Sequence, residues 1–226
     1  MKGALSLIVA AVLFVLYPAL RPWQGESTVD GAVGAMSSPA WVVSHAFAMV
    51  GFILVTLGLL AVVAALRGTR GEALGNAALV TSWIGAGLAL PYYGAEDFGL
   101  HAIASHAAAG EPLNVLSLVD SVRNQPLAIT MFGAGLLTLA ASGVLTALAV
   151  VRSGRLSAIA AWIFAVGYVL FLPQFFGPPA ARIAHGVLLG IGLAWLGFSL
   201  LRNPRDLRDP ERVHAVWMDR LEKPIM

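Results

Sequence analysis

The side chains best able to do chemistry in this sequence lie at or near the ends of long apolar runs. Four of the five histidines, His45, His101, His106 and His185, have such positions, and the acids Glu96 and Asp97 shortly precede His101. Imidazole nitrogen is a ligand of zinc, copper, iron and nickel, and a carboxylate can complete such a set. The residue types therefore indicate a polar site, although the spacing Glu96-x4-His101-x4-His106 matches no known metal motif.

His45 and His185 each lie inside an apolar run, about one helical turn from the same predicted membrane face. A histidine facing lipid is costly, so both imidazoles are expected to turn inward. We expect them to face one shared outer cavity, where two imidazoles could ligate one metal ion or the iron of one haem. The alternative is that each histidine only bonds a neighbouring helix.

Further candidates lie at similar depth. Glu96 and Asp97 are the candidate catalytic acid and base, and His101 is a third candidate metal ligand beside His45 and His185. His106 is read as solvated surface. Cofactor binding is assigned to a set of histidine, arginine and glutamine side chains: His45, His185, Arg123, Gln174 and Arg182. The two arginines could instead lie at the lipid headgroups, and Glu96 could merely end a helix.

Composition defines the elements that must position these residues. The 226 residues are 58% hydrophobic and 12% charged, about half the charge of a soluble domain, and cysteine is absent, which excludes disulfides and thiolate sites. Runs of about 18 to 25 apolar residues are long enough to cross a membrane. The sequence therefore predicts an all-α polytopic membrane protein with six transmembrane helices: 3–20, 42–66, 73–93, 127–151, 156–176 and 181–201.

The longest polar insert is 94–126, in which 96–109 and 113–123 are each expected to form a short helix over the outer mouth of the bundle. Leu113, Leu116 and Val119 have an amphipathic spacing in the second of these. Residues 1–202 are expected to form the transmembrane domain and 203–226 a cytoplasmic tail.

Basic residues set the expected orientation. Of the 14 lysines and arginines, only Arg21, Arg123 and Arg182 fall on the proposed outer side. Because basic residues favour the cytoplasmic side, both termini are expected to be cytoplasmic in the plasma membrane. The expected partners are membrane lipid and other membrane subunits or further copies of the chain. Nucleic acid is not expected, since no such module is present and the pI near 9.3 reflects orientation.

Two resemblances follow from local runs. The runs 38–45, 90–101 and 172–185, which hold Ser-Pro-Ala-Trp, Pro-Tyr-Tyr-Gly-Ala-Glu-Asp and Pro-Gln-Phe-Phe-Gly-Pro-Pro, resemble an uncharacterised family of small six-span bacterial membrane proteins. That resemblance implies the six-span fold and no activity. Ser44, His45 and Asp97 also resemble loosely the zinc-dependent membrane hydrolases, which usually have seven spans and a paired His-x3-His in the last helix, where this chain has His185 alone.

Three functions remain open from the sequence. The first is a haem- or metal-binding protein that performs redox chemistry on a lipid-soluble substrate. The second is a non-enzymatic accessory, sensor or ligand-binding subunit. The third is a zinc-dependent membrane hydrolase that uses Glu96 or Asp97 as acid and base.

Overall fold

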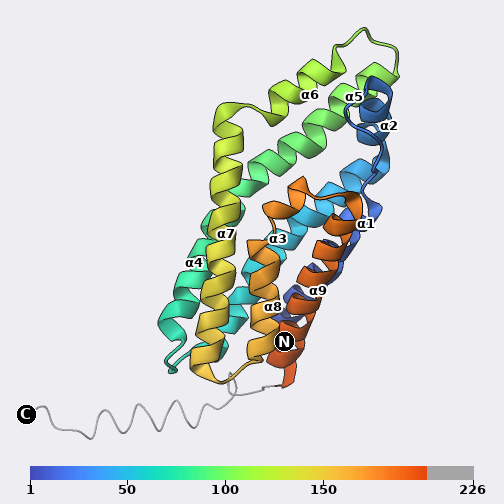
Figure 1. Ribbon diagram of the computed structural model, residues 1–226. Coiled ribbons are helices and arrows are strands. Elements are labelled where there is room, and N and C mark those ends of the chain that lie inside the picture. Colours follow the sequence, from blue (N-terminus) through green and yellow to red (C-terminus); the bar gives the residue numbers. More distant parts are fainter. Residues whose placement is uncertain (203–226) are drawn as a thin grey trace, which may run out of the picture.

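The computed structural model describes residues 1–202, and the predicted tail 203–226 lies outside the described residues. All regular elements in the described part are helical (Figure 1). In chain order they are α1 Lys2–Leu20, α2 Val29–Met36, α3 Pro39–Leu66, α4 Glu72–Gly94, the π-helical turn η1 Ala95–Gly99, α5 Leu100–Ala108, α6 Val115–Arg123, α7 Pro126–Ser153, α8 Ala158–Val169, the 3-10 turn η2 Pro173–Phe176 and α9 Pro179–Arg202.

Five helical segments are long and apolar enough to cross a membrane. They are α1, α3, the continuous run Glu72–Ala108, α7 and α9. The all-helical class is thereby confirmed, and the five apolar helices agree with a multi-pass membrane protein. Their apolar faces also explain why many large hydrophobic side chains remain exposed outside the core.

The predicted fifth span, 156–176, is not confirmed at spanning length. Its helix α8 has 12 residues, or about 18 Å, whereas a hydrocarbon core is roughly 30 Å thick. Proline cannot donate a backbone N–H, and its ring clashes with the carbonyl four residues earlier. Because Pro173 stands four residues after Val169, it accounts for the end of α8 at that residue and for the turn into η2.

Glycines allow the long helices to pack closely. A Cβ at Gly135 of α7 would lie 2.9 Å from the backbone oxygen of Gly85 in α4, and one at Gly190 of α9 would lie 3.0 Å from the backbone oxygen of Ala11 in α1. The Gly186-x3-Gly190 motif therefore serves packing within the chain, where small residues bring membrane helices together.

Helices α2, α5 and α6 gather at the end of the bundle away from the N-terminus (Figure 1). They share a small core that includes Met36, Trp41 and Leu100, and we call α2, η1, α5 and α6 the cap. Helices do form in the predicted insert, although the inward face of α6 carries Val115 and Val119, while Leu113 is exposed. The cap covers one end of the bundle and forms one wall of the site described next.

Candidate functional site

A pocket of about 350 Å³ lies between the cap and the long helices. Its wall is formed by aromatic and aliphatic side chains, and charged side chains lie along one part of its lining. Tyr92 and Phe132 stack in this wall with ring centroids 4.3 Å apart, so α4 and α7 are in contact beside the pocket. The lining consists of Tyr17, Arg21, Glu26, His45, Tyr92, Tyr93, Glu96, Ile129, Arg123, Phe132, Gly133, Leu172, Phe175, Phe176 and Arg182.

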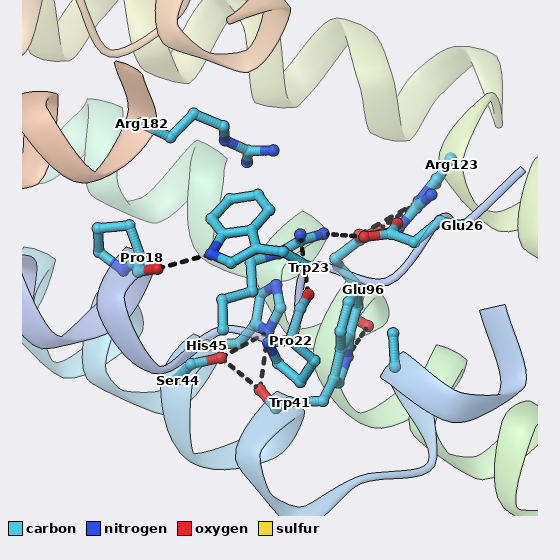
Figure 2. A network of polar contacts seen from close by, with 12 residues as sticks. Pro18, Pro22, Trp23, Glu26, Trp41, Ser44, His45, Glu96, Arg123 and Arg182 are labelled. Carbon is cyan, nitrogen blue, oxygen red and sulfur yellow. Dashed lines mark hydrogen bonds and ion pairs between the residues drawn. The ribbon is translucent and has the colours of Figure 1, made fainter. Parts of the chain in front are cut away.

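Four of these side chains form an alternating chain of charges, which we call the ionic network (Figure 2). Arg21 donates to one oxygen of Glu26 at 2.6 Å, and Arg123 donates to the other at 2.7 Å. The Nε of Arg123 also lies 3.1 and 3.0 Å from the two carboxylate oxygens of Glu96. Two positive and two negative groups therefore neutralise one another.

The network joins four separate parts of the chain. Arg21 is the residue after α1, Glu26 lies in the following loop, Glu96 belongs to η1, and Arg123 ends α6. Burial raises the pKa of Glu26, but Arg21 and Arg123 together lower it further, so the pKa lies below its ordinary value. Burial opposes the charge of Arg123, yet Glu96 and Glu26 outweigh that effect and raise its pKa. The contacts within the network therefore favour the charged forms of Glu26 and Arg123.

Two tryptophans enclose Arg21. Its guanidinium carbon lies 4.5 Å from the ring centroid of Trp23 and 4.7 Å from that of Trp41. The rings are themselves fixed, because Trp23 donates to the carbonyl of Pro18 at 3.0 Å and Trp41 donates to the backbone carbonyl of Glu96 at 3.1 Å. Arg21 is 7% exposed, and its Nε has no hydrogen-bond partner among residues 1–202.

Arg182, near the start of α9, also lies beside Trp23 (Figure 2). Its guanidinium carbon is 4.9 Å from the centroid of Trp23 and 5.0 Å from that of Phe175. Its Nε donates to the side-chain oxygen of Gln174 at 3.0 Å. Within residues 1–202 no carboxylate pairs with Arg182, so its charge is compensated only by ring faces and one neutral amide.

His45 and His185 are both buried, and each bonds a backbone carbonyl. His45 Nδ1 lies 2.8 Å from the Trp41 oxygen, and His185 Nε2 lies 2.7 Å from the Gly167 oxygen. A carbonyl only accepts, so both nitrogens carry a proton. His45 lines the pocket, whereas His185 lines a separate hollow of about 10 Å³.

His45 and His185 were expected to face one shared cavity, but they line two separate hollows. Tyr17 and Arg182 line both of them, and Gln174 lines the smaller one with His185. Across residues 1–202, no three side chains of histidine, aspartate or glutamate gather in a group that could hold a metal ion. The predicted ligand set His45, His101 and His185 is thus not assembled there.

The π-helical turn separates the two candidate acids. Glu96 lines the pocket and accepts hydrogen bonds from Arg123. Asp97 is fully buried and is not part of the pocket lining. Neither of its carboxyl oxygens has a hydrogen-bond partner in the described part of the chain. His101 lies in the cap, where its Nδ1 donates to the carbonyl of Met36 at 2.7 Å. His106 is exposed and pairs with Glu111. Glu96 lines the pocket and Asp97 does not, so the two carboxylates do not face one site. Their catalytic roles stay predictions.

Sequence reasoning missed three residues of the site. Arg21 entered the sequence analysis only as one of the basic residues that set the orientation, and nothing there singled out Glu26 or Trp23. No sequence spacing identifies these residues as parts of a site, because Arg123 and the carboxylate of Glu26 that it binds are 97 residues apart in the chain. The one available signal was that Arg21 directly follows an apolar span and precedes an acid and a tryptophan.

Comparisons of the chain with protein-family models, with curated proteins and with solved structures find no match. The resemblance to a family of six-span membrane proteins therefore stays a prediction. Function must be argued from the geometry of the pocket.

Proposed function

We propose that this chain is a plasma-membrane protein with the cap and pocket at the outer face and both termini in the cytoplasm. The support is the charge bias, since only Arg21, Arg123 and Arg182 among the nine lysines and arginines of residues 1–202 lie at the cap end, where they line the pocket. In this proposal α8, η2 and the turns around them cross the bilayer as a sixth, interrupted span within the bundle. A cysteine at Ser153 of the cysteine-free chain is expected to resist labelling by an impermeant thiol reagent added outside; labelling there would contradict the orientation.

We further propose that the protein is non-enzymatic and binds a small lipid-soluble amphiphile in the outer pocket, as a sensor or ligand-binding subunit does. One observation carries this proposal: an aromatic and aliphatic wall faces a few fixed polar groups in a pocket of about 350 Å³. Ligand sites have this character, with volumes of about 300–1,000 Å³ and few polar groups that orient the ligand.

The state of the acids favours binding over catalysis. A general base needs a carboxylate within hydrogen-bond reach of the proton that it removes. Both oxygens of Glu96 already accept from Arg123, and those of Glu26 accept from Arg21 and Arg123. The pocket therefore offers aromatic surface and positive charge, with its carboxylates occupied.

The experiment fills the pocket from one position. Gly133 lines the pocket, and a Cβ built there would meet nothing within 4 Å, so Gly133→Leu places a side chain in open space. Gly87 of α4 has equally open surroundings and lies outside the lining, so Gly87→Leu is the matched control. Native mass spectrometry of the full chain from detergent, with dodecanoate and dodecan-1-ol added, counts bound molecules.

The proposal predicts saturable binding of one amphiphile to the wild type and to Gly87→Leu, and at least a tenfold weaker affinity in Gly133→Leu. Equal binding by both leucine variants would place any ligand elsewhere. An absence of saturable binding of either compound to the wild type would overturn the proposed function.

A redox function with haem remains a second candidate because of His45. Its Nδ1–H bond to Trp41 leaves Nε2 as a nitrogen with a free lone pair, and a ligating histidine commonly bonds a carbonyl in this way. Aromatic walls and arginines would suit a haem with its propionates. A Soret absorbance band in the purified protein that disappears in His45→Ala would favour this candidate over the non-enzymatic one; a colourless wild type would remove it.

A further inference from the structure

The charges in the pocket do not balance. Three arginines and two glutamates line it, and the ionic network joins two of the arginines to both glutamates. Arg182 is left over. One unit of positive charge therefore faces a pocket whose other walls are aromatic or aliphatic.

We propose that Arg182 binds the carboxylate of a single-chain anionic amphiphile, whose apolar tail occupies the aromatic part of the pocket. This inference rests on the proposed function and adds the chemical class of the ligand.

The geometry around Arg182 prepares its guanidinium for such a ligand. The plane is held between Trp23 and Phe175, and Nε is bound to Gln174. Within residues 1–202, no hydrogen bond occupies the two terminal nitrogens of Arg182, which are the pair that meets both oxygens of a carboxylate in a bidentate contact. A side chain fixed in this way loses little freedom when the ligand binds.

A second observation comes from Arg21. This side chain is more than nine-tenths buried and lines the same pocket, and its Nε has no partner among the residues that the structure describes. Unsatisfied buried donors are rare in proteins, and this one is open to a polar group bound in the pocket. Trp23 is shared by both arginines, because the guanidinium carbons of Arg21 and Arg182 lie 4.5 and 4.9 Å from the centroid of its ring.

Most of the remaining lining residues are aliphatic or aromatic and suit the apolar tail of the proposed ligand. Ile129, Phe132 and Gly133 of α7 face the pocket together with Leu172 and Phe176. Ile129 is 44% exposed and Phe176 is 87% exposed, so this side of the pocket is open towards the surroundings of the helices. In the proposed orientation, a tail would enter from the outer leaflet while its head reaches Arg182.

A carboxylate suits the site better than a more highly charged head. The uncompensated charge is a single unit, and a planar guanidinium can hold both oxygens of one carboxylate, as Nε and one terminal nitrogen of Arg123 together hold those of Glu96. A phosphodiester lipid also carries one negative charge, and the experiment separates it from the carboxylate.

The experiment compares heads on one tail. Dodecanoate and dodecan-1-ol are titrated against the purified full chain at pH 7.5 in neutral detergent, with native mass spectrometry as the readout and phosphatidylglycerol as competitor. The variants are Arg182→Gln, Arg182→Lys and the control Arg152→Gln, which removes one exposed positive charge at the opposite end of α7. Dodecanoate is expected to bind the wild type and the control at least tenfold more tightly than the alcohol.

Loss of a charged hydrogen-bond donor should weaken dodecanoate binding about 10–100-fold in Arg182→Gln, with a smaller loss in Arg182→Lys, while alcohol binding stays unchanged. Equal, saturable binding of acid and alcohol that is indifferent to Arg182 would overturn this inference and leave the proposed function intact. Saturable binding of neither compound would defeat the proposed function itself. Displacement of dodecanoate by an equimolar amount of phosphatidylglycerol would contradict the carboxylate and show that the site prefers a phosphodiester head group. If Arg182→Gln does not fold, the preference of the wild type for acid over alcohol and the Arg182→Lys result decide the matter.

Discussion

Two arginines that line the pocket, Arg123 and Arg182, have different surroundings. Arg123 contacts the carboxylates of Glu26 and Glu96 in a network that joins α6, η1 and the loop after α1, whereas Arg182 contacts two aromatic rings and one amide. A charge that carboxylates of the protein compensate stabilises the fold, and a charge held in place with no carboxylate partner among residues 1–202 is suited to an outside partner. Under the proposed function, the contacts of Arg123 serve the fold and those of Arg182 serve the ligand.

The largest expected effect follows removal of Arg123. Its side chain is 26% exposed, so its loss should cost less than a fully buried pair and more than a surface pair, or about 2–3 kcal/mol. For a chain of this size, the melting temperature should fall by roughly 5–10 °C in Arg123→Ala. Arg123→Lys keeps the charge without the fork and should lose less. Melting of Arg123→Ala within about 2 °C of the wild type would show that the network does not hold the cap.

A smaller effect is expected from acid. Because the pKa of Glu26 is lower in the folded protein than its ordinary value of 4.5, the folded state holds this proton less tightly than the unfolded state. The contribution of Glu26 to stability is therefore complete above that ordinary value and is lost as the pH falls through the folded pKa. Thermal melts of the wild type and Glu26→Gln between about pH 7 and pH 3 should converge at the acid end. Parallel curves would contradict the charge pairing of Glu26.

The smallest effect on stability is expected at Arg182. Its two ring contacts are each worth about 0.5–1 kcal/mol at partly exposed positions, or about 1–2 kcal/mol together, so Arg182→Gln should lower the melting temperature by roughly 2–8 °C without ligand and by less than Arg123→Ala does. A loss as large as that of Arg123→Ala would remove the contrast between the two arginines.

Hydropathy and charge were enough to predict the helical class, the long apolar helices and the inward turn of His45, because burial of apolar length follows from composition. They did not predict that Pro173 would end α8 early, since a window average does not register one missing N–H. Nor could they separate Glu96 from Asp97, because the π-helical turn that directs them to different surroundings has no sequence period. The pairing of Glu26 with Arg123 depends on tertiary contacts and was not accessible from local sequence.

The most direct test of the account is the rise in melting temperature that dodecanoate causes in the wild type and in Arg182→Gln. Ligand at about 100 times its dissociation constant stabilises a folded protein by about 2.7 kcal/mol, or roughly 5–10 °C here. We predict that rise for the wild type and for the control Arg152→Gln, and a rise of about half that size or less for Arg182→Gln at the same dodecanoate concentration. An equal rise in Arg182→Gln would contradict the assignment of ligand binding to Arg182.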